Sequence, residues 1–379
     1  MAWTVVQAVH GGPDMTQSVY LRPIALADSP QSEEGEALRL GGGLVYASRF
    51  AVIEREQGKV TARSRYSLPE LRAALPGLPA AVQEQFDNLQ RAHAPLQCGS
   101  RTVRLDQPQV MGILNVTPDS MSDGGQFMDS PEVANAHAAA MLEAGAAIID
   151  VGGESTRPRA AAVWEGDELK RVIPAIELLA KSGAAISVDT RRPGVMEAAL
   201  AAGAHIINDV SALRHDPRSL EFAARADVPV VLMHAPGEGD DLHANAAYSD
   251  VVLDVFDWLV ARRDAALAAG IARDKIVLDP GIGFGKSVAE NLALLNALPL
   301  FHALGQPLLL GASRKRTIGA LSNEAPAHKR LGGSVMLAVK GMEAGVQLLR
   351  VHDVPETVQA LHVWRGLKDA ALTDFSQLA

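Results

Sequence analysis

Short, continuously apolar runs alternate with longer stretches of helical spacing from residue 110 toward the C-terminus. Runs without polar alternation are typical of parallel strands that are buried on both faces. The stretches between them are rich in Ala and Leu, and three of them end at Gly145, Gly203 and Gly345, as helices commonly do. The eight runs cover residues 110–116, 146–153, 185–190, 205–211, 229–234, 275–281, 307–313 and 348–353. The pattern therefore predicts eight strands joined by helices.

Eight strand–helix units in about 270 residues match the usual size of a TIM barrel. The alternative is an open, doubly wound parallel sheet, which the same alternation could build. Such a nucleotide-binding sheet carries a G-x-G-x-x-G motif in its first strand–helix turn, and the turn VMGILNVTPDSMSDGG has none. We therefore predict an α/β fold, a (β/α)8 TIM barrel over residues 106–379 with an additional N-terminal region.

Residues 1–105 show a different pattern. The segment 39–55 predicts a short hairpin or strand pair, and the segment 67–94 predicts one or two amphipathic helices. The polar segment QSEEGEA at 31–37 predicts an exposed turn. Because no chemical motif appears in this region, we expect a small appended domain or a structural collar.

The overall charge restricts the kind of partner that the chain can bind. Forty-four acidic against thirty-five basic side chains give a net charge of −9, which repels nucleic acids and anionic lipid surfaces. An anionic ligand must then be held by local cations and backbone amides. The chain has one cysteine, Cys98, and neither a signal-peptide pattern nor an 18-residue apolar run. We therefore predict a cytoplasmic protein without nucleic-acid or membrane partners.

Each predicted strand ends in at least one polar or ionisable residue. In a TIM barrel the loops that follow the strands converge on one active site, so these groups are expected at one opening. Any single one of them could instead cap the next helix. The strand-end groups are Asn115, Asp150 with Glu154, Asp189, Asn208 with Asp209, His234, Asp279, the set Ser313, Arg314 and Lys315, and the pair Arg350 and His352.

Charge divides this expected site into two ends. Asp189, Asn208 and Asp279 follow the third, fourth and sixth strands, and their oxygens suit the N–H donors along one edge of a flat heterocycle. Arg350 and His352 lie two residues apart on the last strand and therefore point to the same side, where they suit a diphosphate or a carboxylate. The alternative for Arg350 is a structural ion pair with Asp353 or another acid.

Glycine-rich loops follow three of the strands. The segment DPGIGFGKS at 279–287 resembles a P-loop, but Pro280 stands where that motif requires Gly. We interpret glycines 281, 283 and 285 as positions where the backbone closely approaches a flat ligand. The long loops 115–127 and 152–166 are predicted to act as mobile lids.

Seven ordered segments carry a resemblance to a known family: ILNVTPDSMSDGG, GAAIIDVGGESTRP, ISVDT, INDVS, DPGIGFGK, GASRKR and LRVHDV. In this order and spacing they resemble dihydropteroate synthases, over about residues 108–370. The resemblance implies a TIM-barrel transferase of folate biosynthesis that is a target of sulfonamides. Such an enzyme joins 4-aminobenzoate to 6-hydroxymethyl-7,8-dihydropterin diphosphate, releases diphosphate, and commonly uses Mg²⁺ and forms a homodimer.

The resemblance also implies roles for individual residues. The pterin would contact Asp189, Asn208, Asp279 and Lys315, with Gly283, Phe284 and Met233 as further substrate-binding residues. The aminobenzoate would lie against Thr156, Arg157, Pro158 and Ser313. Arg350 and His352 would hold the diphosphate and, with Lys315, act in catalysis, while Asn115 would meet the metal or the diphosphate. Met121 stands where the family usually has Phe, so we expect a different shape of the aminobenzoate pocket there.

Two other functions are compatible with a pterin-binding barrel. A pterin-dependent methyltransferase would keep the acidic end but needs no diphosphate site, which the Ser-Arg-Lys set and the pair Arg350 and His352 argue against. A non-catalytic paralogue would be expected to lack loop residues, whereas Asn115, Arg157 and Lys315 are all present. The synthase is therefore the favoured function.

Overall fold

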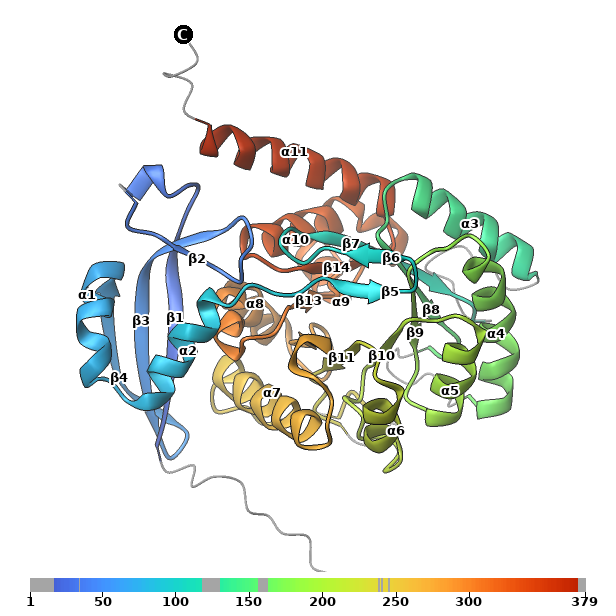
Figure 1. Cartoon of the computed structure of the whole chain (residues 1–379), viewed down its shortest axis with the longest axis horizontal. Helices are drawn as coiled ribbons and strands as arrows, with labels where there is room; N and C mark the ends of the chain where they lie inside the picture. The colour runs from blue at the N-terminus through green and yellow to red at the C-terminus, as the bar shows by residue number, and fades with distance from the viewer. Residues whose placement is uncertain are drawn as a thin grey trace, which may run out of the picture.

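The computed structural model of the chain contains a parallel eight-stranded sheet that curls into a barrel (Figure 1). It describes residues 17–33, 35–117, 130–155, 163–237, 239, 241–244 and 246–373. The strand order is β12-β11-β10-β9-β8-β7-β14-β13, and a bridge between Leu278 and Leu308 joins its two edges. The strands are β7 (Gln109–Asn115), β8 (Ile148–Gly152), β9 (Ile186–Asp189), β10 (Ile206–Asp209), β11 (Val230–Met233), β12 (Ile276–Asp279), β13 (Leu309–Leu310) and β14 (Leu348–Val351). All eight predicted strands are present, and the TIM-barrel prediction is confirmed.

Helices alternate with these strands and surround the barrel. They are α3 (Pro131–Glu143), α4 (Glu165–Ala180), α5 (Pro193–Ala202), α6 (Ser219–Ala226), α7 (Val251–Ala268), α8 (Val288–Asn296), α9 (Arg316–Leu321), α10 (Leu331–Glu343) and α11 (Val354–Leu372). Their ends have local causes: Ser287 and Glu290 form a capping box on α8, and Gly203 ends α5 with a φ of 112°. In the described part of the chain, no helix combines the length and the apolar character that crossing a bilayer requires.

A hairpin closes the N-terminal end of the barrel. Its strands are β5 (Leu96–Cys98) and β6 (Arg101–Val103), and they place Leu96, Cys98 and Val103 in one apolar cluster with residues of the barrel strands. Burial raises the pKa of the Cys98 thiol to about 11, so this cysteine is a packing residue. Because side chains fill this end, a ligand has to enter from the opposite, C-terminal end of the strands.

The N-terminal region forms an antiparallel sheet with two helices. Its elements are β1 (Gln17–Ala27), η1 (Gln31–Glu33), β2 (Leu38–Arg39), β3 (Tyr46–Glu56), β4 (Lys59–Ser67), α1 (Leu68–Ala74), η2 (Leu75–Gly77) and α2 (Ala80–Gln90). The two helices predicted at 67–94 are confirmed. The hairpin predicted at 39–55 is present only as the short pairing of β2 with β3, because β3 pairs mainly with β1 and β4.

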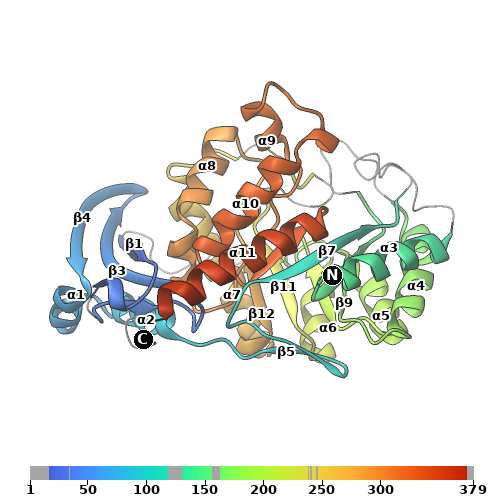
Figure 2. The same cartoon turned by 90° about the horizontal axis from the view of Figure 1, so that it is seen from above.

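The N-terminal sheet lies beside α7 of the barrel (Figure 2), and polar contacts join the two. The Tyr20 hydroxyl donates to Asp257 of α7 at 2.7 Å, and Arg55 pairs with Asp254 and Asp257. Burial raises the pKa of Tyr20 to about 12 and that of Asp257 to about 6. At the far end of α11, Lys368 donates to Asp28 at 3.0 Å. The sheet is therefore attached at two places and shares the main apolar core of the barrel.

Candidate active site

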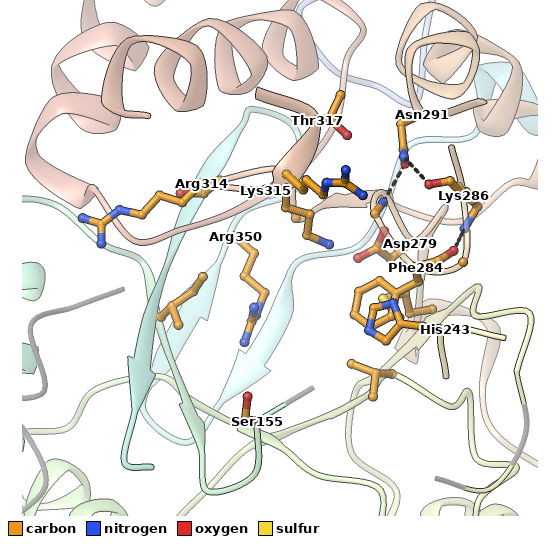
Figure 3. Close-up of a pocket in the computed structure, with 18 of the residues that line it drawn as sticks. Ser155, His243, Asp279, Phe284, Lys286, Asn291, Arg314, Lys315, Thr317 and Arg350 are labelled. Carbon is orange, nitrogen blue, oxygen red and sulfur yellow. Dashed lines mark hydrogen bonds between the residues drawn. The ribbon is translucent and has the colours of Figure 1, made fainter. Parts of the chain in front are cut away.

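A cavity of about 1100 Å³ opens at the C-terminal ends of the barrel strands (Figure 3). Polar side chains from several strands and the loops after them line it together. Those predicted from the sequence are Asn115, Asp189, Asn208, Asp279, Ser313, Lys315, Arg350 and His352, and Met233, Gly283 and Phe284 line it as well. Residues that lie up to about 240 positions apart in the sequence thus meet in one site, as the barrel geometry predicts.

Arg350 lies at the centre of a buried network of acids. Its Nε donates to Asp150 at 2.6 Å and its Nη2 donates to Asp189 at 2.7 Å. Asn208 donates to the same Asp150 oxygen at 3.1 Å. Asp353, the other acid considered for Arg350, instead accepts from Arg314 at 3.1 Å. The alternative of an ion pair is therefore the one that the structure shows for Arg350, with Asp150 and Asp189 as its partners.

Burial makes this network sensitive to any change of charge. Desolvation raises the pKa of Asp189, the nearby Arg350 guanidinium lowers it in part, and Asp150 raises it again. The guanidinium pKa of Arg350 is itself raised, because the attraction of Asp150 and Asp189 outweighs its desolvation. Arg350 is therefore the positive charge that offsets the burial of two carboxylates, of which Asp189 lines the cavity.

A second charged pair lies across the cavity. Asp279 accepts a hydrogen bond from the Gly281 backbone at 2.7 Å, which fixes the carboxylate at the end of β12. Lys315 donates to the Ile282 carbonyl, and its Nζ lies 4.4 Å from the centre of the Phe284 ring. Burial lowers the pKa of Lys315 to about 8, and Asp279 opposes that shift. Burial also raises the pKa of Asp279, which Lys315 opposes in turn.

Lys286 and Asn291, which are not among the site residues predicted from the sequence, hold the loop after β12. Lys286 donates to the carbonyls of Gly281 at 2.8 Å and Phe284 at 3.1 Å. Asn291 accepts from the Gly283 amide at 2.6 Å and donates to the Lys286 carbonyl at 3.1 Å. Burial lowers the pKa of Lys286 to about 7. This lysine thus binds backbone oxygens of its own loop. In a P-loop the corresponding lysine binds phosphate instead.

Ser313 and His352 form a polar pair near Arg350. The His352 Nδ1 lies 3.1 Å from the Ser313 hydroxyl oxygen, and the His352 backbone amide donates to the same oxygen at 3.2 Å. Ser313 follows β13 and is buried, whereas His352 is half-buried. The hydroxyl therefore sets the orientation of the imidazole at the cavity wall.

Three strand-end residues, Asp150, Asp209 and His234, are not among the described residues that line the cavity. The expectation that every strand delivers a polar group to this opening is therefore wrong for β11, which His234 follows. The His234 ring packs edge-on against Trp258 at 4.8 Å, and burial lowers its pKa to about 2. Asp209 accepts from the backbone amides of Ser211 and Leu213 and so shapes the turn after β10. Successive side chains of a strand point to opposite sides, so Met233 faces the cavity and His234 does not.

Part of the expected aminobenzoate pocket falls outside the described residues. This applies to Thr156, Arg157, Pro158 and Met121, and to the parts 118–127 and 156–162 of the two loops that were predicted as lids. Glu154 and Ser155, which precede the second of these gaps, do line the cavity. Glu154 is held by Arg191 at 2.9 Å and by Arg192 at 3.1 Å.

The fold and this cavity define a TIM-barrel enzyme whose site combines buried carboxylates with the cations Arg350 and Lys315. The sequence pattern of the family described as "Pterin binding enzyme" matches residues 111–352. The Neisseria meningitidis serogroup B dihydropteroate synthase is 48% identical over 276 residues, which cover 72% of this chain and 96% of that protein. The chain therefore belongs to the pterin binding enzyme family, and within it to the dihydropteroate synthases.

Solved structures agree with this assignment. The Xanthomonas albilineans dihydropteroate synthase with 4-aminobenzoic acid has a TM-score of 0.68 and 49% identity, covering 73% of this chain and 99% of that one. The Yersinia pestis dihydropteroate synthase in complex with a sulfonamide drug has a TM-score of 0.69 and 45% identity, covering 73% of this chain and 99% of that one. These matches cover nearly the whole of the relatives, while about a quarter of this chain lies outside them.

Proposed function

We propose that this chain condenses 6-hydroxymethyl-7,8-dihydropterin diphosphate with 4-aminobenzoate to give 7,8-dihydropteroate and diphosphate, the transferase step of folate biosynthesis. The observation that carries the proposal is the cavity itself, which Asp189, Asn208 and Asp279 line together with Lys315 and Arg350. The relatives named dihydropteroate synthase support the reaction, and the 4-aminobenzoic acid in one solved relative supports the second substrate.

The acid-rich wall suits the pterin ring. A pterin presents ring N–H groups and an exocyclic amine along one edge, and a carboxylate can accept two parallel hydrogen bonds from such an edge. Asp279 is fixed by the Gly281 amide, so it offers its remaining acceptor capacity at a defined place. Lys315, across from Asp279, can donate to a pterin carbonyl or ring nitrogen. Lys286 and Asn291 hold the backbone of this loop and keep the wall in place before substrate arrives.

The cationic groups suit the leaving diphosphate. As the bond between the pterin methylene and the diphosphate oxygen breaks, negative charge grows on the diphosphate, and groups that bind it more tightly in the transition state accelerate the step. Arg350 uses Nε and Nη2 for Asp150 and Asp189, and a guanidinium has further N–H donors that can reach an anion. His352, oriented by Ser313, lies on the same side. The aryl amine of 4-aminobenzoate then attacks the methylene carbon and gives up a proton.

We also propose Mg²⁺ as the cofactor, held by Asn115 together with the diphosphate. In the described part of the chain, no group of three or more His, Cys, Asp and Glu side chains could hold a metal ion. A single amide oxygen at the cavity wall fits an ion that takes most of its ligands from phosphate oxygens and water. The chemistry that the bound ion supplies is neutralisation of the charge on the diphosphate.

For the assembly we propose a homodimer through α10 and α11. These helices lie side by side on one flank of the barrel (Figure 2) and expose Met336, Val363 and Leu367, with 59%, 61% and 67% of each residue accessible. Large apolar side chains exposed on two adjacent helices are what an interface between two copies would cover. A cytoplasmic location is proposed as well, since the single buried cysteine fits a reducing compartment. The sulfonamide bound by the Yersinia pestis relative supports sulfonamides as inhibitors of this chain.

The roles of the two ends can be separated with His352→Ala. If His352 holds the diphosphate, the variant binds the pterin diphosphate several-fold more weakly, while a pterin without diphosphate binds as it does to the wild type. Calorimetry with both ligands measures this difference. Equal losses for the two ligands would remove the diphosphate end of the proposal and favour a pterin enzyme of another kind.

A further inference from the structure

The loop between β11 and α7 brings an aromatic residue into the cavity that neither the strands nor the family motifs account for. His243 lines the cavity, and its ring stacks on Phe284 with the ring centres 4.8 Å apart and the planes 10° from parallel (Figure 3). The Lys315 ammonium nitrogen lies 4.4 Å from the centre of the same Phe284 ring. Phe284 is thus fixed by two neighbours from two other loops.

The backbone on either side of this contact is held closely. Leu242 is buried in a small cluster with Met233 and Phe284, so the residue next to His243 is anchored by its packing. A Cβ on Gly285, where φ is +56°, would lie 2.7 Å from the Ala244 carbonyl oxygen. The two loops therefore approach each other more closely than a larger residue would permit. The stacked rings are a consequence of this approach.

The position of His243 indicates which substrate it affects. Asp189, Asn208 and Asp279 end their strands at the bottom of the cavity, and they are the groups that suit the pterin. His243 lies in a loop beyond the strand ends and is half-buried. With the pterin at the bottom, the second substrate has to approach from the rim, on the side of the cavity that Phe284 and His243 line.

We propose that His243 is a positioning residue for the aryl amine substrate, because its ring holds Phe284 in place at the rim of the cavity. This inference rests on the proposed function, since it assigns a role at the same site. A planar ring at position 243 is the property that matters, so phenylalanine can replace histidine there, whereas alanine cannot.

The experiment compares the steady-state kinetics of His243→Ala, His243→Phe and the wild type. His243→Ala is expected to raise KM for 4-aminobenzoate about fivefold, which corresponds to about 1 kcal/mol, with kcat changed by less than about twofold. Its Kd for the pterin stays within about twofold of the wild type, and His243→Phe restores KM to within about twofold. The pterin Kd also shows that each variant is folded, and His243→Asn provides a second variant without a ring.

A matched control is available in the neighbouring loop between β10 and α6. His215 is half-buried and its Nδ1 lies 3.3 Å from the Gly239 carbonyl oxygen, so it contacts the loop that carries His243 without touching Phe284. His215→Ala should leave KM for 4-aminobenzoate within about twofold of the wild type. The inference is overturned if His243→Ala leaves that KM unchanged, if His243→Phe is as impaired as His243→Ala, or if His215→Ala has the same effect. An inactive wild type would overturn the proposed function and the inference together, whereas an active wild type with these results overturns the inference alone.

Discussion

Removing the charge of Arg350 should destabilise the protein, and the loss should depend on pH. Arg350→Met keeps much of the side-chain volume but leaves Asp150, which is fully buried, and Asp189 without their common cation. Breaking a buried ion pair by removing one partner costs about 3 to 5 kcal/mol. The Arg350 side chain is 20% exposed, so water relieves part of this cost. We therefore expect a loss of about 3 kcal/mol in the free energy of unfolding at pH 8.

The sign of the pH dependence follows from the pKa of Asp189. Burial already raises that pKa and Arg350 opposes the rise, so the pKa increases further in Arg350→Met. A carboxyl group with a raised pKa in the folded state binds a proton that the unfolded state has released. The stability of the variant therefore increases relative to the wild type as pH falls from 8 toward 7, by up to about 1.4 kcal/mol per pH unit for each proton. Below about pH 7 the wild-type Asp189, whose pKa is raised to about 7, binds the proton as well, so the difference between the two proteins stays constant.

The assay is urea denaturation followed by circular dichroism at pH 8 and at pH 5.5. Arg314→Met is the control, because Arg314 pairs with Asp353 outside the acidic network and the two side chains are 19% and 12% exposed. For Arg350→Met we expect that the loss in the free energy of unfolding is smaller at the lower pH by at least about 1 kcal/mol. For Arg314→Met we expect a smaller change with pH. An equal loss for Arg350→Met at both pH values would show that the acids do not depend on Arg350 for their charge.

Three further predictions concern other residues. Lys315 has a pKa lowered to about 8, so kcat/KM for the pterin substrate should fall as pH rises through about 8, and a pH–rate profile of Lys315→Arg should lack that fall, since arginine keeps its charge. Asp279→Ala should lose pterin binding, at about 1 to 3 kcal/mol for each lost hydrogen bond, and calorimetric affinity within about threefold of the wild type would contradict this. Arg55→Met leaves two α7 carboxylates without their cation and should cost about 2 kcal/mol in urea denaturation, while pterin affinity stays unchanged; an unaltered denaturation midpoint would show that the contact does not stabilise the attachment of the N-terminal sheet.

The barrel could be predicted because its strands are buried on both faces. Continuous apolar runs such as 230–233 indicate buried parallel strands, and the polar residue after each run marks the strand end. The N-terminal strands β1 and β4 carry no such signal. The residues of β4 are mostly exposed, including Arg63 and Arg65, because β4 is an edge strand paired only with β3. Charged side chains of this kind protect an edge and conceal the strand in the sequence.

The site was predictable where a residue acts from the end of a strand. Asp189, Asn208 and Asp279 fall into this class, and the structure places them in one cavity. His234 follows its strand in the same way but packs on Trp258, since one residue of register decides which side a side chain faces. Lys286 acts through backbone oxygens of its own loop, and His243 contacts a ring on another loop. Contacts of that kind depend on how two loops meet, which no local pattern specifies.

In the proposed reaction, the cavity joins a pterin to an aryl amine with loss of diphosphate. Incubation of the purified chain with 6-hydroxymethyl-7,8-dihydropterin diphosphate, 4-aminobenzoate and Mg²⁺, with dihydropteroate and diphosphate quantified in the same sample, tests this reaction. Equal amounts of the two products, formed only when both substrates are present and lost in Asp279→Ala, are the predicted result. Pterin binding without condensation, or diphosphate release that does not require 4-aminobenzoate and yields no dihydropteroate, would contradict the account.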